Sequence, residues 1–238
     1  MDKVITIHQP DFLPWTGFFH RWMVSDLLII LDDVQFIRRG WHHRDKIKTA
    51  QGVKWLTVPV KKKGRYFDTI NRIEINDAED WKKSHLNQIR SAYGKAPRFH
   101  VLFPQLQKIY SKPWRYLMDL NLAMLKFIAD QLDIRVPFCM ASDFSIALKG
   151  TEKLLALVQA VQGRAYLTGL GARDYLKEYL FQAQAIPVIW SPYTCPDYPQ
   201  LHHGFAPYLS ILDALMMLPP RKIKRLCSGD TDHAQMHA

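Results

Sequence analysis

The chain has 238 residues, of which 48% are hydrophobic, and its formal net charge is +10. No apolar run is long enough to cross a membrane, the N-terminus lacks the order of a signal peptide, and the three cysteines form no C-x-x-C pair. We therefore expect a cytoplasmic protein without a transmembrane segment or a disulfide framework. We expect one domain over residues 1–227 and a polar tail over residues 228–238. The positive charge is expected to attract phosphate-bearing molecules.

The first elements predict a β-α-β unit. Val4–His8 and residues 27–31 are apolar runs typical of buried parallel strands, and Pro14 suits the first turn of a helix that reaches Trp22. Ligands of such units bind where the strands end. The side chains that follow the two strands are therefore candidate site residues: His8, Gln9, Asp11, Asp32, Asp33 and Gln35.

The rest of the chain predicts a hairpin, a helical middle and a return to α/β alternation. Residues 44–60 alternate charged and apolar side chains around Ala50-Gln51-Gly52, which is typical of two strands joined by a short turn. The predicted fold class is α/β, with a mostly parallel sheet and flanking helices, a β-hairpin insertion after strand two and a helical middle segment. Apolar patterning predicts helices at 78–93, 99–110, 113–132, 151–161, 172–184 and 208–218, and strands at 70–75, 138–141, 165–168 and 187–190.

The stretch H-Q-P-D-F-L-P-W-T-G-F-F, residues 8–19, joins the first strand to the first helix. Imidazole transfers protons near neutral pH, so His8 is a candidate catalytic base; the alternative is a hydrogen-bonded core histidine. Gly17 lets a backbone or a ligand approach closely, and Trp15 is a candidate substrate-binding side chain.

Residues 32–49 gather carboxylates, guanidinium groups, two imidazoles and an indole in one segment. Arg44 and Lys48 are candidate catalytic residues, because cationic side chains stabilise phosphate or a developing oxyanion, and Trp41 is a candidate stacking surface for a base or sugar. The alternative is a solvated hairpin whose charges maintain solubility. Asp32 and Asp33 lack further ligands at metal-binding spacing, so we expect no metal site.

Two later segments carry further candidates. Y-L-T-G-L-G-A-R-D-Y-L, residues 166–176, predicts a strand, a loop and a helix start. Gly169 and Gly171 can therefore present backbone N–H groups to an anion, or form a plain tight turn. A proline-rich loop follows and supplies the candidate substrate-binding residues Tyr198 and Gln200.

Several motifs in the same order resemble those of the WbqC-like family of bacterial proteins. They are H-Q-P-D-F-L-P-W-T-G-F-F, L-D-D-V-Q-F, W-H-H-R-D-K-I-K-T, W-L-T-V-P-V, Y-L-T-G-L-G-A-R-D-Y-L, P-D-Y-P-Q and L-S-I-L-D-A-L, spread over residues 4–218. The family takes its name from O-antigen gene clusters, so the resemblance implies a role in building surface polysaccharide, with no particular reaction or cofactor. Where family members tend to read W-x-N-R-N, this chain departs from the pattern with Trp41-His42-His43-Arg44-Asp45.

Three functions remain open from the sequence. The first is a transferase that adds an acyl or aminoacyl group to a nucleotide-linked amino sugar, with His8 as base and Arg44 or Lys48 as electrostatic partner. The second is a protein that binds tRNA or another nucleic acid, with aromatic side chains stacking on bases among basic residues. The third is a non-catalytic partner of a polysaccharide assembly complex, placed on the membrane face by its basic loops.

Overall fold

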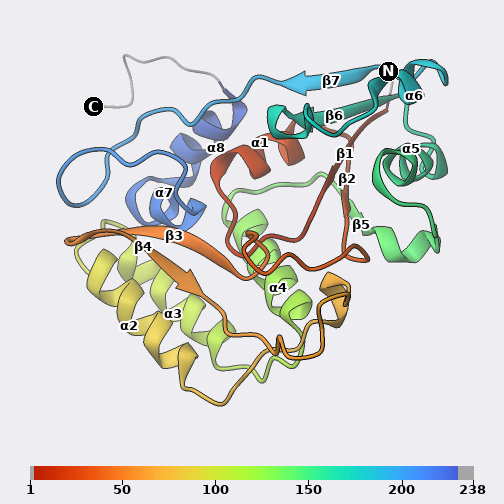
Figure 1. Cartoon of the computed structure of the whole chain (residues 1–238). Coiled ribbons are helices and arrows are strands. Elements are labelled where there is room, and N and C mark those ends of the chain that lie inside the picture. The colour runs from red at the N-terminus through yellow and green to blue at the C-terminus, as the bar shows by residue number, and fades with distance from the viewer. Residues whose placement is uncertain (1–2, 230–238) are drawn as a thin grey trace.

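A computed structural model describes residues 3–229 and confirms the predicted α/β architecture (Figure 1). Within these residues the main sheet has five strands in the order β5-β2-β1-β6-β7, and every neighbouring pair is parallel. The sheet combines the β-α-β unit at the start of the chain with the alternating segment near its end. The strands are β1 Val4–His8, β2 Leu27–Ile30, β5 Phe138–Met140, β6 Ala165–Gly169 and β7 Val188–Ser191.

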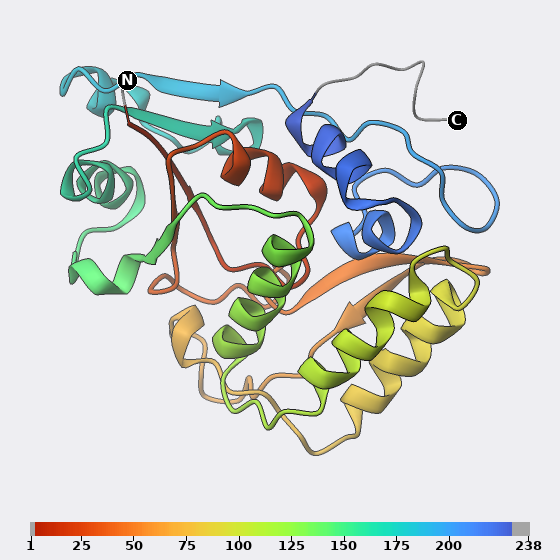
Figure 2. The ribbon, with the colours of Figure 1, turned by 180° about the vertical axis from the view of Figure 1, so that it is seen from behind.

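Alternate side chains of the strands face two different helical layers, which Figure 1 and Figure 2 show from opposite sides. Leu28 and Ile30 pack into one apolar cluster with Phe19, whereas Ile29 packs into a second cluster with Leu157. This period of two, buried on both faces, explains why the strands are continuous apolar runs. The first layer contains α1 (Thr16–Met23), α4 (Leu117–Gln131), α7 (Ile211–Met217) and α8 (Pro220–Ser228), and the second contains α5 (Gly150–Ala160) and α6 (Glu178–Gln182).

The predicted hairpin forms a separate antiparallel pair, β3 (Arg44–Thr49) and β4 (Gly52–Thr57). Its turn includes Gly52 with a φ of +96°, a conformation that glycine adopts without strain. Ile47 and Leu56 are buried on one face of the hairpin, in the same apolar cluster as Ile89 of α2. Helices α2 (Trp81–Tyr93) and α3 (Phe99–Tyr110) therefore cover this face, as Figure 1 shows.

The predicted strand at 70–75 is wrong. The segment contains a short 3-10 helix, Ile70–Arg72 (η1), and Ile75 forms only an isolated bridge with Val60. The cause is a bond to the end of β2: the backbone N–H of Asn71 donates to the Asp32 carbonyl and its side-chain amide donates to the Asp32 carboxylate, each at 3.0 Å. The end of the segment still pairs with the residues after β4, since the Lys61 N–H donates to the Glu74 carbonyl at 2.9 Å, but it forms no strand.

Two predicted helices have different bounds. The helix expected at 172–184 is replaced by a 3-10 turn, Leu170–Ala172 (η3), and the short helix α6. The helix expected from residue 208 begins at Ile211, because Tyr208 has a φ of +55° and the Ser210 hydroxyl caps the helix by accepting from the Leu212 N–H at 3.2 Å. A further 3-10 helix, Ala141–Phe144 (η2), follows β5.

Helix α8 was not predicted, because the last helix expected from the apolar pattern ended at residue 218. Pro220 instead occupies the first turn of α8, where its missing N–H costs no hydrogen bond. The apolar side of this basic helix is buried at Ile223 and Leu226. Apart from Ser228 and Gly229, the predicted tail lies outside the described residues, and no described helix is long and apolar enough to span a membrane.

Candidate functional site

Two adjoining cavities lie at the carboxyl end of the parallel strands. The smaller has a volume of about 420 Å³ and the larger a volume of about 840 Å³. Ligands of open α/β sheets bind at this edge, and cavities of this size accommodate small molecules. The walls of both cavities share five residues: His8, Gln9, Trp15, Ile37 and Tyr208.

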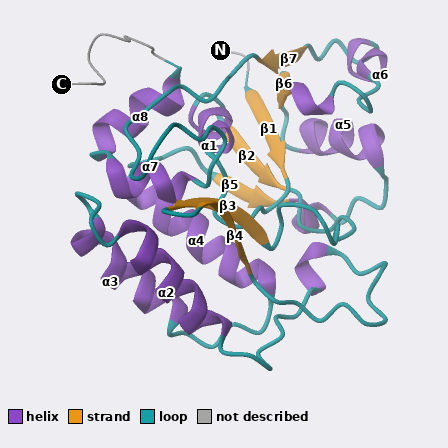
Figure 3. Cartoon of the chain, turned by 60° about the vertical axis from the view of Figure 1, so that its left-hand side comes forward, coloured by secondary structure: helices purple, strands orange, loops and turns teal. Residues whose placement is uncertain are grey.

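Three segments that are remote in the sequence meet around these cavities. The opening loop contributes to both cavities. The segment before the hairpin contributes Trp41 and His42 to the smaller cavity, and β3 contributes Asp45. The glycine turn contributes Gly169 and Gly171 to the larger cavity. Figure 3 shows the hairpin lying beyond the ends of β1 and β2. The two cavities therefore form one candidate site with two lobes.

Asn121 of α4 fixes the opening loop against the hairpin segment. Its fully buried amide nitrogen donates two hydrogen bonds of 2.7 Å, to the carbonyl oxygens of Pro10 and His42. The Phe12 N–H adds a third link by donating to the Trp41 carbonyl at 3.0 Å. Because a buried carbonyl without a donor is costly, the helical core sets the relative position of the two loops.

His8 stands at the end of β1 with its ring against Phe18, at 4.8 Å between ring centroids. Its Nδ1 lies 2.9 Å from the Gln9 carbonyl oxygen, and because a carbonyl only accepts, Nδ1 carries the hydrogen of the neutral ring. Nε2 is then an acceptor. Burial, assisted by the charge of Arg21, lowers the pKa of His8 to about 3, so the ring is neutral at physiological pH.

A short relay of hydrogen bonds orients the Gln9 amide. The Ile37 N–H donates to His42 Nδ1 at 3.4 Å, so the neutral His42 ring carries its hydrogen on Nε2. That Nε2 lies 2.8 Å from Gln9 Oε1 and donates to it. Burial lowers the pKa of His42 to about 4, which keeps this tautomer neutral. The Gln9 NH₂ group is consequently available as a donor in the shared wall.

Two buried carboxyl groups belong to the smaller cavity. Burial raises the pKa of Asp11 to about 7, although the charge of Arg21 opposes the shift. Burial also raises the pKa of Asp45 well above its usual value, with a smaller contribution from the charge of Asp11. Asp11 Oδ2 lies 3.7 Å from His8 Nδ1. A carboxyl group that titrates near neutral pH can both accept and donate a proton.

Aromatic side chains form the wall between the lobes. The Trp15 indole lies directly over Gly17, where a Cβ atom would stand 2.2 Å from two indole carbons. Trp15 also contacts Tyr208 and Tyr193, at 5.2 and 5.6 Å between ring centroids. Gly17, which lines neither cavity, therefore acts by accommodating an indole rather than a ligand.

Two basic side chains, Arg21 of α1 and Lys153 of α5, belong to the wall of the larger cavity. Lys153 is buried, and its Nζ pairs with the Asp33 carboxylate at 2.7 Å. The Arg21 guanidinium lies against Gly169, where a Cβ atom would stand 3.1 Å from Nη1. Gly169 thus gives the arginine room.

The three residues predicted at the end of β2 do not line either cavity. Asp32 accepts from the Ser142 N–H at 3.0 Å in addition to the Asn71 amide, which links β2 to η2. Asp33 is the partner of Lys153. Gln35 donates to the Tyr66 carbonyl at 2.9 Å. These residues follow β2 and so lie near the site, but polar contacts with neighbouring segments hold their side chains outside the cavity walls.

Arg44 and Lys48, the predicted electrostatic partners, also lie outside the cavity walls. The Arg44 guanidinium donates to the Arg39 carbonyl at 2.7 Å and stacks over the Trp55 ring at 4.3 Å. Lys48 is buried, and its Nζ donates to the backbone carbonyls of His202 and Gly204.

Tyr198 and Gln200 belong to the loop that Lys48 holds. Gln200 makes two 2.9 Å hydrogen bonds with the backbone of Ala206. Tyr198 is buried in the first apolar cluster, beside the Asp213 carboxylate. The positions of Lys48, Tyr198 and Gln200 therefore favour a structural role in fixing this loop.

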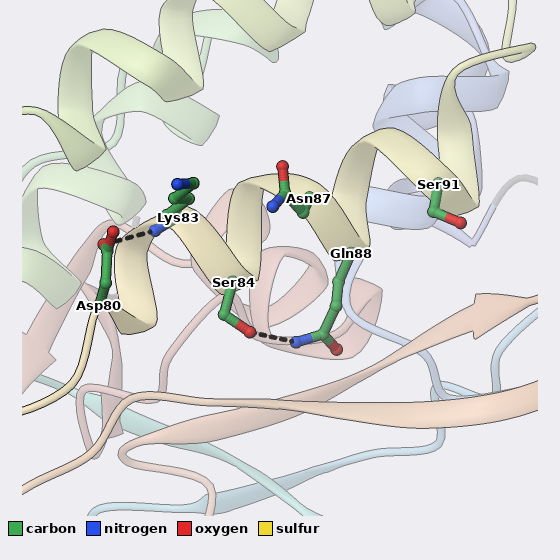
Figure 4. Close-up of a pocket in the computed structure, with 6 residues that line it drawn as sticks. All are labelled: Asp80, Lys83, Ser84, Asn87, Gln88 and Ser91. Atoms are coloured by element: carbon green, nitrogen blue, oxygen red, sulfur yellow. Dashed lines mark hydrogen bonds between the residues drawn. The ribbon is translucent and has the colours of Figure 1, made fainter.

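A separate hollow lies along α2, and Figure 4 shows the six side chains that line it: Asp80, Lys83, Ser84, Asn87, Gln88 and Ser91. All of them come from a single helix and its cap, where Asp80 accepts from the Lys83 N–H and Gln88 donates to Ser84. No other element faces them across a cavity, so they do not make a converging site. Among residues 3–229, no group of three or more His, Cys, Asp or Glu side chains is arranged to hold a metal ion.

Comparison with known proteins identifies the family. A model of the WbqC-like protein family matches residues 9–225. The chain belongs to this family. The "Uncharacterized protein Rv1507c" of Mycobacterium tuberculosis is 37% identical to it over 215 residues, which cover 90% of this chain and 93% of that protein. No solved structure matches the chain.

Sequence reasoning missed several residues of this site, among them Arg21, His42 and Asp45. Arg21 carries the clearest signal, because a charged residue inside F-F-H-R-W sits among residues that pack α1 onto the sheet. His42 and Asp45 were read as part of a charged hairpin segment, yet both are buried. Only the tertiary contact between the hairpin segment and the opening loop reveals them.

Proposed function

We propose that this protein is a transferase that adds an acyl or aminoacyl group to the amine of a nucleotide-linked amino sugar during bacterial surface polysaccharide (O-antigen) biosynthesis. The family name supports the biological setting. The observation that carries the chemistry is Asp11, a carboxyl group with a pKa raised to about 7 in a cavity wall, next to His8 and Gln9.

Amide formation needs a base for the attacking amine and a donor for the developing oxyanion. The amine nitrogen forms a bond to the acyl carbon, the bond from that carbon to the leaving group breaks, and one amine proton must reach the leaving group. Asp11 accepts that proton and passes it on. The Gln9 NH₂ group, aimed by His42, donates to the acyl oxygen.

In this proposal Asp11, rather than His8, is the base. His8 remains neutral, but with a pKa lowered to about 3 its Nε2 is a weak base at neutral pH. Its role in the proposal is to accept a hydrogen bond from the substrate and to hold the opening loop through Nδ1. Asp45 of β3 supplies a second buried carboxyl group.

The test is an assay of purified protein with a panel of nucleotide-linked amino sugars and with acyl thioester or aminoacyl-tRNA donors, followed by mass spectrometry of the sugar. Acylated product from one pair, lost in Asp11→Asn with sugar affinity preserved, supports the proposal. Absence of binding to every nucleotide-linked sugar contradicts it. Undiminished turnover in Asp11→Asn removes Asp11 from the mechanism.

A second candidate function, tRNA binding, is favoured by one exposed patch. Trp41 and Trp55 are 44% and 40% exposed, and their ring centroids lie 5.3 Å apart. Arg44 stacks over Trp55 and the Lys46 amine lies 5.4 Å from the Trp41 ring, so the patch combines stacking surfaces with positive charge. Electrophoretic mobility shift with tRNA at increasing salt tests it: phosphate contacts require affinity to fall steeply with salt.

A further inference from the structure

The cationic side chain of Arg21 is largely buried. Its residue is 7% exposed, and its guanidinium makes no hydrogen bond or ion pair with any residue among 3–229. A buried charge is normally paired, because transfer out of water is costly. Arg21 belongs to the wall of the larger cavity, where its side chain is within reach of a bound anion.

The other charges around the larger cavity do not neutralise Arg21. The Asp33 carboxylate is already paired with Lys153, the second cation of the wall. Asp11 interacts with Arg21 electrostatically, but no ion pair joins them, and the raised pKa of Asp11 leaves that carboxyl partly protonated at neutral pH. The larger cavity therefore carries one uncompensated positive charge from the residues that line it.

The surroundings of Arg21 are built to hold the guanidinium in place. Gly169 leaves room for it, and the backbone of β6 continues into η3 beside it. Thr168 and Tyr166 line the same cavity. Trp15, Tyr193 and Tyr208 provide aromatic surface for an attached ring.

We propose that Arg21 binds the anionic group of the substrate, a phosphate or a carboxylate, through the planar fork of its guanidinium in the larger lobe. That this cavity is the substrate site rests on the proposed function. Binding of an anion to Arg21 can be measured without any catalytic turnover. A guanidinium fits both anions because its paired N–H groups match two oxygens of one group. The reacting group then extends into the smaller lobe, toward Asp11 and Gln9, since the lobes share His8, Gln9 and Trp15.

Isothermal titration calorimetry of the full chain distinguishes the anions, with uridine diphosphate and inorganic phosphate in one arm and acetate and glycine in the other. Arg21→Met should weaken the bound probe by about 30-fold, and Arg21→Lys, which keeps the charge without the fork, should weaken it less. The matched control is Arg164→Met, which removes an exposed arginine at the opposite, amino end of β6.

Thermal unfolding without ligand provides an independent readout. Removing an uncompensated buried cation should leave the melting temperature of Arg21→Met equal to or above that of the wild type. A large decrease in the melting temperature would mean that Arg21 is a structural residue, and it would overturn the proposal. In the calorimetry, unchanged affinity of Arg21→Met for the probe, or no binding of any probe to the wild type, would also overturn it. Anion binding that depends on Arg21 without any transfer product would preserve this proposal while contradicting the transferase.

Discussion

His42 donates a 2.8 Å hydrogen bond to the side-chain oxygen of Gln9, and this contact determines which end of the glutamine amide faces the cavity. The two residues are 33 positions apart in the sequence and come from different loops. The candidate site is therefore assembled by contacts between loops, and its donors are oriented by neutral histidine rings rather than by charged ones.

His42→Phe should disable the Gln9 donor while keeping an aromatic ring in place. The Gln9 oxygen and the Ile37 N–H would each lose a partner, so we expect a loss of about 1–3 kcal/mol in stability and a larger proportional loss in turnover. Denaturant unfolding and steady-state kinetics measure the two effects. His100→Phe on the exposed face of α3 is the control, and equal turnover in the two variants would refute the orienting role.

Gly17→Ala tests the packing of Trp15. Alanine is favoured over glycine inside a helix by about 1 kcal/mol, so the substitution would stabilise α1 if the space over Gly17 were free. The Cβ atom would instead stand 2.2 Å from the Trp15 indole. The indole lines both lobes, and it would have to move out of this position. We expect a lower melting temperature and a shifted tryptophan emission; a more stable variant would contradict this packing.

Lys48→Met separates a structural role from a catalytic one. Methionine fills the volume of the buried side chain but leaves the carbonyls of His202 and Gly204 without their donor, so we expect about 1–3 kcal/mol of destabilisation. Affinity for a nucleotide-linked sugar should match that of Lys54→Met, a control on the exposed side of the hairpin. Lost turnover at unchanged stability would instead favour the catalytic role predicted from the sequence.

The parts of the fold that follow from local pattern were predictable. Apolar runs predicted the buried strands, and their order along the chain predicted a parallel sheet with crossover helices. Site residues were predictable in the same way only where they directly follow a strand whose end lies at the cavity. His8, Gln9 and Asp11 directly follow β1, so the end of that strand places them at the cavity.

The remaining site residues depend on contacts that the sequence does not display. Asp32 and Asp33 occupy the equivalent position after β2, but Asn71, Ser142 and Lys153 engage their carboxylates. The segment 70–75 has strand composition, yet its bond to Asp32 turns it into η1. Side-chain hydrogen bonds between distant segments, which no local pattern encodes, decided these cases.

Asp11→Asn should stabilise the protein above neutral pH. The folded-state pKa of Asp11 is raised to about 7 from 3.8, so the unfolded chain ionises first and stability falls as pH rises from about 4 through 7. The variant removes this penalty, with a gain of at most about 4 kcal/mol at alkaline pH that disappears as pH falls toward 4. Urea unfolding of both proteins across this range measures it. The other carboxyl and imidazole groups in the wall of the smaller cavity are His8, His42 and Asp45, and the charge of Arg21 acts on Asp11.

A gain that persists unchanged at pH 4 would show that the asparagine acts through packing or hydrogen bonding and not through ionisation. Glu79→Gln, which removes an exposed carboxylate ahead of α2, is the control and should alter stability little at any pH in the range.

The most direct test of the account is the titration of the Asp11 carboxyl carbon by nuclear magnetic resonance, assigned by comparison with Asp11→Asn. We predict a midpoint near pH 7, since burial in the cavity wall holds the proton far above its usual range. A midpoint near 4 would mean that Asp11 is an ordinary ionised carboxylate at neutral pH, and it would contradict its proposed role in proton transfer.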